Sequence, residues 1–489
     1  MKKSPFYITT TLPYVNADPH VGFAVELIRA DIVARSKKLV GHEVFFNTGT
    51  DEHGAKIDKT AAAQNMTPQQ YVDEKSKKFR DLLPTLGIMP EINFIRTTDA
   101  HHISAAQEFW RIVQKNGFIY KKDYSIKYCV GCELEKTDSE LVDGRCPLHP
   151  LQEIEIIHEE NYFFKFSAFQ QKLLDLYKSN PMLVVPDFRF NEIKAFVERG
   201  LEDFSISRLK SKMSWGIAVP GDPDQVMYVW FDALVDYVSA VGWPDDMNKF
   251  EKFWKETGGV VQYCGKDNLR QQSAMWQSML MAAGLPPSKT IVIDGFVTGD
   301  GGIKMSKSLG NTVDPFELVK EYCTDALRYF AARELSPFED SPFTPEKFKD
   351  AYNAGLANGL GNLVSRVMKM ATSNGVSFDE KAAKAFAASD EMDRVYKEQM
   401  AGFDAYDLQK ASKVVWDLIA ATDKIIQDRQ PFKKIKTDKE AAENDIQELL
   451  SRLETIGTML LPLLPETAEK VIVLVKENKM PEAPLFMRK

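Results

Sequence analysis

Two lysines in a glycine-flanked loop are the residues of this sequence whose types and spacing most clearly suggest a chemical role. The segment GDGGIKMSKSLGN occupies residues 299–311 and follows an apolar run at 291–293. Glycines make such a loop mobile, and Lys304 and Lys307, three positions apart, can meet the charge of a leaving pyrophosphate. The alternative is an ordinary lysine-rich surface loop. We interpret the segment as part of a phosphate site in an enzyme that uses ATP.

A second phosphate site is predicted where a strand gives way to a helix at His20. Asp18 can cap this helix and Pro19 suits its first turn, so the free N–H groups of the helix start can face an anion. His20 can donate to a phosphate oxygen, and Gly22 lets a flat base approach the backbone. A capped helix with an incidental histidine is the competing interpretation.

A third motif has the spacing of a metal site. Cys129 and Cys132 form one C-x-x-C pair, and Cys146 and His149 form a second pair thirteen residues later. Three thiolates and an imidazole can surround one Zn²⁺ tetrahedrally, and four protein ligands close the site, so a structural zinc is predicted. A redox C-x-x-C pair is the alternative, although it would not need the second pair.

Strands that alternate with helix-length segments should position these motifs. Short apolar runs at 6–11, 44–47, 260–264 and 291–293 predict an α/β fold with a mostly parallel sheet. Ligands of such sheets bind at the carboxyl ends of the strands, where the unusual loops fall. After Pro345 the strand signals almost vanish, and apolar residues at three-to-four spacing predict helices at 411–427 and 445–460 in a helical bundle.

Length and composition limit the remaining possibilities. The 489 residues predict roughly three domains. We expect a catalytic domain in two halves, 1–115 and 191–344, an inserted subdomain at 116–190, and the helical bundle at 345–489. The net charge of −8 argues against indiscriminate nucleic-acid binding. With no apolar run long enough for a membrane span and no signal core, a cytoplasmic protein that does not bind membranes is predicted.

Together the first two motifs resemble those of class I aminoacyl-tRNA synthetases. The segment from His20 to Gly22 is similar to the "HIGH" motif, and residues 304–308 match "KMSKS" letter for letter. Residues 48–54, 201–208, 215–216, 228–233 and 265–267 resemble the methionyl-tRNA synthetase family, and the similarity runs from Phe6 to the C-terminus. The resemblance implies a Rossmann-like catalytic domain with an inserted zinc knuckle, followed by an all-α anticodon-binding bundle. It also implies that L-methionine is activated with ATP and Mg²⁺ and then transferred to tRNA(Met).

The resemblance further implies roles for individual residues. His20, Lys304 and Lys307 would be catalytic, stabilising the phosphate in the transition state without a nucleophilic side chain. ATP would be bound by His20, Gly22, Lys266, Asp267 and Lys307. Methionine would be bound by Leu12, Tyr14, Asp51, Trp230, Ala233, Tyr237 and Trp276, although without the resemblance the aromatic residues would be read as core. Asn362, Arg366 and Phe432 would contact the anticodon, and the resemblance of the C-terminal ending implies a monomer.

Three positions depart from the family pattern. Phe23 stands where the last histidine of "HIGH" is expected, which removes one donor to the phosphates. Asn268 and Gln272 replace an isoleucine and a histidine in the expected methionine pocket. These departures keep a second hypothesis open, a catalytically weak or silent homologue that binds tRNA. Other class I synthetases and a zinc-ribbon regulator are further alternatives.

Overall fold

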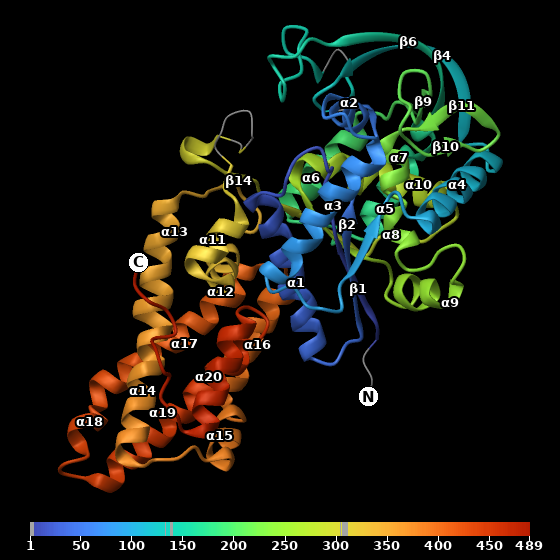
Figure 1. The fold of residues 1–489 in the computed structure, drawn as a ribbon. Helices are drawn as coiled ribbons and strands as arrows, with labels where there is room; N and C mark the ends of the chain where they lie inside the picture. The colour runs from blue at the N-terminus through green and yellow to red at the C-terminus, as the bar shows by residue number, and fades with distance from the viewer. Residues whose placement is uncertain (1–3, 133, 137–139, 304, 306–311) are drawn as a thin grey trace.

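A six-stranded parallel sheet forms the centre of the N-terminal part of the protein (Figure 1). The computed structural model describes residues 4–132, 134–136, 140–303, 305 and 312–489. The strand order is β3-β2-β1-β12-β13-β7, and every neighbouring pair is parallel. The strands are β1 (Phe6–Thr10), β2 (Val44–Thr50), β3 (Asn93–Arg96), β7 (Val184–Val185), β12 (Val261–Gly265) and β13 (Thr290–Asp294). The predicted α/β class with a parallel sheet is confirmed.

Both faces of this sheet are covered by apolar layers. On β1, Phe6 and Ile8 pack in one hydrophobic cluster with α1 (Val21–Leu39), whereas Tyr7 belongs to a second cluster with α4 (Ala100–Lys115). This alternation follows from the two-residue period of a strand, and burial on both sides explains the nearly continuous apolar sequence of these strands. Because all six strands run in one direction, the loops after Thr10, Thr50, Gly265 and Asp294 meet at one edge.

Smaller antiparallel sheets and short helices extend the catalytic part. The strands β4 (Ile119–Cys129) and β6 (Glu155–Phe164) form a long ribbon that projects from it (Figure 1). The ribbon also pairs with β5 (Leu134–Glu135) and β8 (Phe204–Ser205), and a separate small sheet contains β9 (Ser207–Leu209), β10 (Ala218–Val219) and β11 (Asp222–Met227). The helices here are α2 (Ala55–Ala63), α3 (Pro68–Thr85), α5 (Gln170–Ser179), α6 (Asp187–Glu198), α7 (Val229–Ala233), α8 (Asp236–Ser239), α9 (Met247–Phe250), the π-helical turn η5 (Gln271–Met275) and α10 (Trp276–Ala282).

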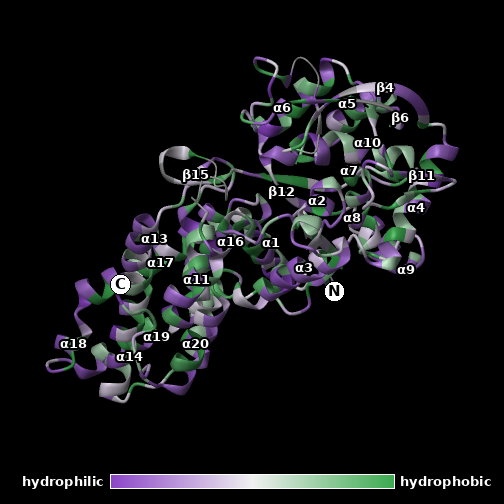
Figure 2. Cartoon of the chain, turned by 45° about the horizontal axis from the view of Figure 1, so that its top comes forward, coloured by the Kyte–Doolittle hydropathy of each residue, from purple (hydrophilic) through white to green (hydrophobic). Residues whose placement is uncertain are grey.

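Helices make up almost all of the C-terminal part. After the short pair β14 (Val297–Thr298) and β15 (Ser341–Pro342), the chain continues through α13 (Pro345–Ala351), the π-helical η9 (Tyr352–Gly361), α14 (Asn362–Asn374), α15 (Glu380–Ala387), α16 (Asp390–Asp404), α17 (Leu408–Arg429), α18 (Pro431–Lys434), α19 (Lys439–Leu460) and α20 (Pro465–Glu477). The helices predicted at 411–427 and 445–460 lie within α17 and α19. Hydrophobic and hydrophilic residues alternate along these helices, as expected where each buries one face (Figure 2). Within the described residues, no helix combines the length and apolar character needed to cross a membrane.

Two buried arginines lie near the junction of the catalytic part and the helical part, and one of them, Arg328, joins the two. Arg328, on α12 (Thr324–Tyr329), forms a fully buried ion pair with Asp31 of α1 at 2.7 Å and donates to the carbonyls of Pro462 and Leu463 in the bundle. Arg29 of α1 donates to the carbonyls of residues 331 and 335–337. One hydrophobic cluster also runs from α1 into α14, α17 and α19. The two parts therefore share a core, and the domain boundaries proposed from the sequence remain predictions.

Candidate functional site

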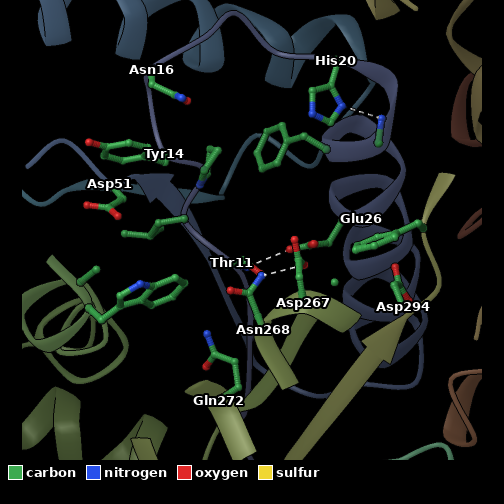
Figure 3. Close-up of a pocket in the computed structure, with 18 of the residues that line it drawn as sticks. Thr11, Tyr14, Asn16, His20, Glu26, Asp51, Asp267, Asn268, Gln272 and Asp294 are labelled. Atoms are coloured by element: carbon green, nitrogen blue, oxygen red, sulfur yellow. Dashed lines mark hydrogen bonds between the residues drawn. The ribbon is translucent and has the colours of Figure 1, made fainter. Parts of the chain in front are cut away.

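A cavity of about 390 Å³ opens at the carboxyl edge of the parallel sheet (Figure 3). This volume lies within the range of small-ligand sites. The loops after β1, β2, β12 and β13 all contribute to its wall, together with α1, α7 and α8. Nine of the residues predicted to bind ATP or methionine line it: Leu12, Tyr14, His20, Gly22, Asp51, Trp230, Ala233, Tyr237 and Asp267. The structure therefore brings most of the predicted site together from segments more than 200 positions apart.

Two other predicted residues, Trp276 and Lys266, are described by the structure and do not line this cavity. Trp276 is fully buried behind the wall, where its ring meets that of Tyr237 edge to face at 5.9 Å. Lys266 forms an ion pair with Asp340 at 2.7 Å and lies over the Phe296 ring. Lys304 and Lys307 lie outside the described residues.

His20 sits at the start of α1 as the N-cap residue. Its Nδ1 accepts a hydrogen bond from the backbone N–H of Gly22 at 3.1 Å (Figure 3). Since a backbone N–H can only donate, the neutral ring carries its proton on Nε2, which is then a donor. A Cβ on Gly22 would lie 2.9 Å from the His20 ring, so glycine is needed for the ring to fold over the first turn. This arrangement prepares a donor beside the positive end of a helix dipole.

The predicted cap at Asp18 is wrong. Helix α1 begins at Val21 with His20 as its cap, two residues later than the capping motif suggested. The Asp18 carboxylate instead pairs with Lys75 at 2.8 Å and Lys78 at 3.1 Å, both on α3. The two lysine ammonium groups carry a full positive charge, so they bind this carboxylate more strongly than the free backbone N–H groups at the helix start would. These ion pairs also anchor the loop that leads to His20.

Phe23 occupies the wall of the cavity one turn into α1. Its ring contacts Phe79 of α3 edge to face at 5.3 Å and packs against both neighbouring hydrophobic clusters. The position is therefore filled by apolar packing. The donor that the family pattern would place here is absent, which leaves His20 as the histidine of this segment.

Asp51 and Tyr14 are brought together by a short bridge between the loops after β1 and β2. The Asp51 N–H donates to the Pro13 carbonyl at 3.0 Å, and the Val15 N–H donates to the Asp51 carbonyl at 3.1 Å. Both residues line the cavity, and Figure 3 shows them close to each other. These backbone hydrogen bonds join the segments that follow two neighbouring strands, so the Asp51 carboxylate and the Tyr14 ring are held next to each other.

Carboxyl groups at the end of the cavity next to α1 were missed by sequence analysis. Glu26, on α1, accepts from the Thr11 N–H at 2.8 Å, and burial, reinforced by the charge of Asp294, raises its pKa to about 8. Glu26 is half-buried and lines the cavity. Burial also raises the pKa of Asp294 to about 6, although the nearby Arg29 guanidinium, 3.2 Å away, opposes this shift. The sequence around Glu26 does not reveal that its carboxyl group faces the end of a strand, because the residue resembles any other polar residue of a helix.

The Glu26 carboxyl makes folding less favourable as pH rises. Its folded pKa of about 8 exceeds the ordinary 4.5, so the folded chain holds a proton that the unfolded chain has lost between these values. The free energy of unfolding should therefore fall, relative to the Glu26→Gln variant, as pH rises from 4.5 to 8. Urea denaturation across this range measures the difference. An equal difference for Glu108→Gln, a position whose side chain is 40% exposed, would contradict the prediction.

Short helices α7 and α8 supply the aromatic wall. Trp230 lies on α7 and Tyr237 on α8, and both line the cavity. Asn268 and Gln272 complete this side (Figure 3). Gln272 donates to the Tyr237 hydroxyl at 2.7 Å. The two departures from the family pattern therefore make this wall polar.

The four predicted metal ligands form one cluster at the end of the β4–β6 ribbon. The Cys129, Cys132 and Cys146 sulfurs and a ring nitrogen of His149 all lie within 4.8 Å of one another. A tetrahedral Zn²⁺ requires ligand separations of about 3.5–3.8 Å, and the Cys132–Cys146 and Cys129–His149 distances are 3.5 Å and 3.8 Å. The residues could thus hold one zinc ion. The tight packing extends to Gly131, where a Cβ would lie 2.4 Å from the His149 ring.

Zinc should be lost when one ligand is removed. We expect about one zinc per chain in the purified protein and a small fraction of that in Cys146→Ser, because a three-ligand site no longer closes around the ion. Metal analysis by mass spectrometry measures it. Cys323→Ser, remote from the cluster, is the matched control and should retain the metal. Zinc-free wild-type protein, or equal zinc in both variants, would contradict the prediction.

The residues implied in anticodon binding lie on the bundle, away from the cavity. Asn362 is exposed at the start of α14 and borders an open groove of about 410 Å³. Arg366, one turn later, is half-buried and paired with Asp423 of α17. Phe432, on α18 directly after α17, has 46% of its surface exposed, and Lys433 lies over its ring. An exposed aromatic ring next to a cation suits stacking with an unpaired base.

Comparison with known proteins decides the family. The profile described as "tRNA synthetases class I (M)" matches residues 6–154 and 149–368, and the one described as "Anticodon binding domain of methionyl tRNA ligase" matches residues 374–483. The chain belongs to the methionyl-tRNA synthetase family. The synthetase is therefore an enzyme of the methionine–tRNA ligase class, with an α/β catalytic part and a helical anticodon-binding part.

Relatives cover the synthetase almost from end to end. The methionine–tRNA ligase of Thermosynechococcus vestitus is 39% identical over 480 residues, which span 95% of this chain and 89% of the relative. The chloroplastic/mitochondrial methionine–tRNA ligase of Arabidopsis thaliana is 38% identical over 94% of this chain and 75% of its own length. The Mycobacterium tuberculosis methionyl-tRNA synthetase, solved in complex with methionyl-adenylate, superimposes with a TM-score of 0.89 at 36% identity, covering 96% of this chain and 94% of that one.

Proposed function

We propose that the cavity binds methionine and ATP side by side and joins them as methionyl-adenylate. The observation that supports this most strongly is the meeting of a carboxylate, an aromatic wall and a histidine-capped helix start around one 390 Å³ cavity. The M. tuberculosis relative was solved with methionyl-adenylate, which agrees with the proposal. In this reaction a carboxylate oxygen of methionine attacks the α-phosphate, and the bond to the leaving pyrophosphate breaks. The terminal adenosine of tRNA(Met) then takes the methionyl group and releases AMP.

The methionine would occupy the end of the cavity next to Asp51. Its ammonium group would pair with the Asp51 carboxylate, and its side chain would lie among Leu12, Trp230, Ala233 and Tyr237. Aromatic rings make favourable contacts with a thioether sulfur. Tyr14 would cover the site from the loop after β1. Trp276, which packs on Tyr237 from behind, would act by supporting that ring.

The nucleotide would lie across the start of α1. His20 would donate to the phosphates, with Gly22 keeping its ring in place, and Asp267 would face the nucleotide from the loop after β12. Lys304 and Lys307 would neutralise the charge of the leaving pyrophosphate, with Mg²⁺ bound to ATP itself. Lys266, which lies beside Phe296 at the wall of the cavity, would help to bind ATP. Catalysis would then depend on positioning and charge stabilisation alone.

The zinc ion would have a structural role at the wall of the cavity. Gly131 and Cys132 line the cavity, so the metal that holds the knuckle together would also hold this part of the wall. Four protein ligands leave no open position for a substrate. The monomeric state and the cytoplasmic location expected from the sequence remain predictions.

The tRNA would be recognised on the bundle through Asn362, Arg366 and Phe432. The profile match to an anticodon-binding domain supports this assignment, as does the exposure of Phe432. The ion pair with Asp423 orients the Arg366 guanidinium, whose remaining N–H groups can reach base edges.

ATP–pyrophosphate exchange with each amino acid in turn tests the proposal. We expect the wild-type protein to catalyse exchange with methionine. In Asp51→Asn the KM for methionine should rise, whereas the KM for ATP should not change. Charging of tRNA(Met) should weaken in Arg366→Gln while tRNA-independent exchange is retained. Exchange with another amino acid would refute the assigned substrate, and a complete absence of exchange would favour a homologue that only binds tRNA.

A further inference from the structure

A buried histidine and a buried aspartate connect two segments that line the cavity. The Nδ1 atom of His53 lies 3.3 Å from the Oδ2 atom of Asp232, which is within the distance of an ion pair. His53 is 4% exposed and Asp232 is 0% exposed, and neither is among the residues that line the cavity. Within the described residues, neither Asp232 oxygen has a conventional hydrogen-bond partner. Burial raises the pKa of Asp232 and the nearby His53 ring opposes this shift, so the ring compensates for the burial of the carboxyl group.

The loop that contains Trp215 holds the backbone on both sides of His53. The ring N–H of Trp215 donates to the Glu52 carbonyl at 2.6 Å. The backbone N–H of Gly54 donates to the Trp215 carbonyl at 3.1 Å. His53 is thus attached to a segment whose backbone is fixed, and it lies two residues after Asp51, which lines the cavity.

Asp232 lies on α7, the short helix that carries part of the aromatic wall. Trp230 and Ala233 of this helix line the cavity. The helix has five residues and no side chain caps its start, and a helix this short keeps its position only through tertiary contacts. Phe231 supplies an apolar contact, because its ring meets that of Trp110 at 5.2 Å. The Asp232 carboxyl group supplies a polar contact with the loop after β2.

We propose that His53 and Asp232 are positioning residues that set the size of the pocket for the methionine side chain. The proposal rests on the methionine site assigned above, in which Asp51 binds the ammonium group and Trp230 contacts the side chain. The buried pair holds α7 at one distance from the loop that carries Asp51, so the two binding groups fit one length of amino acid. A side chain that is longer by one methylene has to push α7 away, which the pair resists.

The ratio of kcat/KM for methionine to kcat/KM for ethionine measures this selection by size. Ethionine carries one more methylene at its sulfur end and is the probe in ATP–pyrophosphate exchange. A fixed apolar pocket discriminates against one methylene by roughly 10–200-fold. In His53→Gln the ratio should fall by about three- to ten-fold, because the amide nitrogen is bonded to Cδ and no longer lies where Nδ1 faces Asp232. The KM for ATP should not change, because its proposed contacts lie on α1 and the loop after β12.

His53→Asn is the matched variant that keeps the contact. The amide nitrogen of asparagine is bonded to Cγ, as Nδ1 of histidine is, so its N–H can donate to Oδ2 of Asp232. The ratio should stay close to that of the wild type although the imidazole ring is lost. Asp232→Ala should lower the ratio as His53→Gln does. The variant with both changes should have the ratio of the single variants, because each change removes the same contact.

Asp325→Ala is the control for the loss of a buried carboxyl group. Asp325, on α12, is 1% exposed, accepts from the Thr467 N–H at 2.6 Å and does not line the cavity. Its variant should unfold at a lower urea concentration but keep the wild-type ratio. An equal fall of the ratio in Asp325→Ala would show that any loss of stability loosens the pocket, and the proposal would be refuted.

The proposal is also overturned if folded His53→Gln and Asp232→Ala both keep the wild-type ratio, or if the two reductions multiply in the double variant. Should one of these variants fail to fold, the other is compared with His53→Asn, and a fall of the His53→Asn ratio to the same value refutes the proposal. Wild-type protein that does not exchange with methionine would refute the proposed function instead. The two failures are thus distinguishable.

Discussion

Replacing His20 with alanine should slow methionine-dependent ATP–pyrophosphate exchange by about 10²–10³-fold, the usual loss when one preorganised donor to a developing charge is removed. The reason lies in its local geometry. The Gly22 N–H holds Nδ1 at 3.1 Å, so the ring presents its Nε2 proton at the start of α1 without reorganisation. Phe23 packs against Phe79 and has no N–H or O–H group in its side chain, so it cannot substitute as a donor. The loss should appear in kcat, measured at saturating ATP and methionine.

His42→Ala is the matched control for this experiment. His42 is remote from the cavity, and its Nδ1 contacts the Ser4 carbonyl at 2.8 Å, so exchange should be unchanged. If His20→Ala raised only the KM for ATP and left kcat intact, the histidine would contribute ground-state binding alone, and its proposed role in the transition state would be refuted.

Arg328→Met should lower the free energy of unfolding by about 3–5 kcal/mol, the typical cost of removing one partner from a buried ion pair. The variant leaves the Asp31 carboxylate in a fully buried site and removes the donor from the carbonyls of Pro462 and Leu463. Methionine has a similar length, so a cavity contributes little. Urea denaturation followed by circular dichroism measures the change.

Arg35→Met tests whether burial is the cause. Arg35 pairs with the same Asp31 carboxylate at 2.7 Å, but 23% of its side chain is exposed, so water can replace it. Its loss should cost about 1 kcal/mol or less. Equal losses in the two variants would contradict the argument.

Local patterns in the sequence were enough to predict the sheet and the metal cluster. The strands β1, β2, β12 and β13 are apolar runs that read as strands because both sheet faces are buried. The four predicted zinc ligands fall within twenty-one positions, so their spacing alone could indicate a common site. Similarly, α17 and α19 were predictable because each repeats apolar residues at helical spacing.

Features that depend on distant partners could not be predicted in this way. β7 contains two residues and joins the sheet only through its pairing with β13, so it carries no sequence signal of its own. The Asp18 cap failed because Lys75 and Lys78 approach from another helix. The buried hydrogen bonds from Gln262 to Gln272 and from Gln272 to Tyr237 depend on side-chain geometry, and nothing in the spacing of these residues suggests contact. Placing Lys304 and Lys307 still depends on the resemblance.

The shared core around Arg29 and Arg328 holds two surfaces at a fixed distance from each other. One is the cavity at the start of α1, the other is the proposed anticodon surface on α14 and α18, and α1 is tied to the segment between them. A fixed distance selects a tRNA by its length as well as by its sequence. We expect that a tRNA with the correct anticodon but one extra base pair between its two ends would not reach both surfaces, so this synthetase would aminoacylate it poorly.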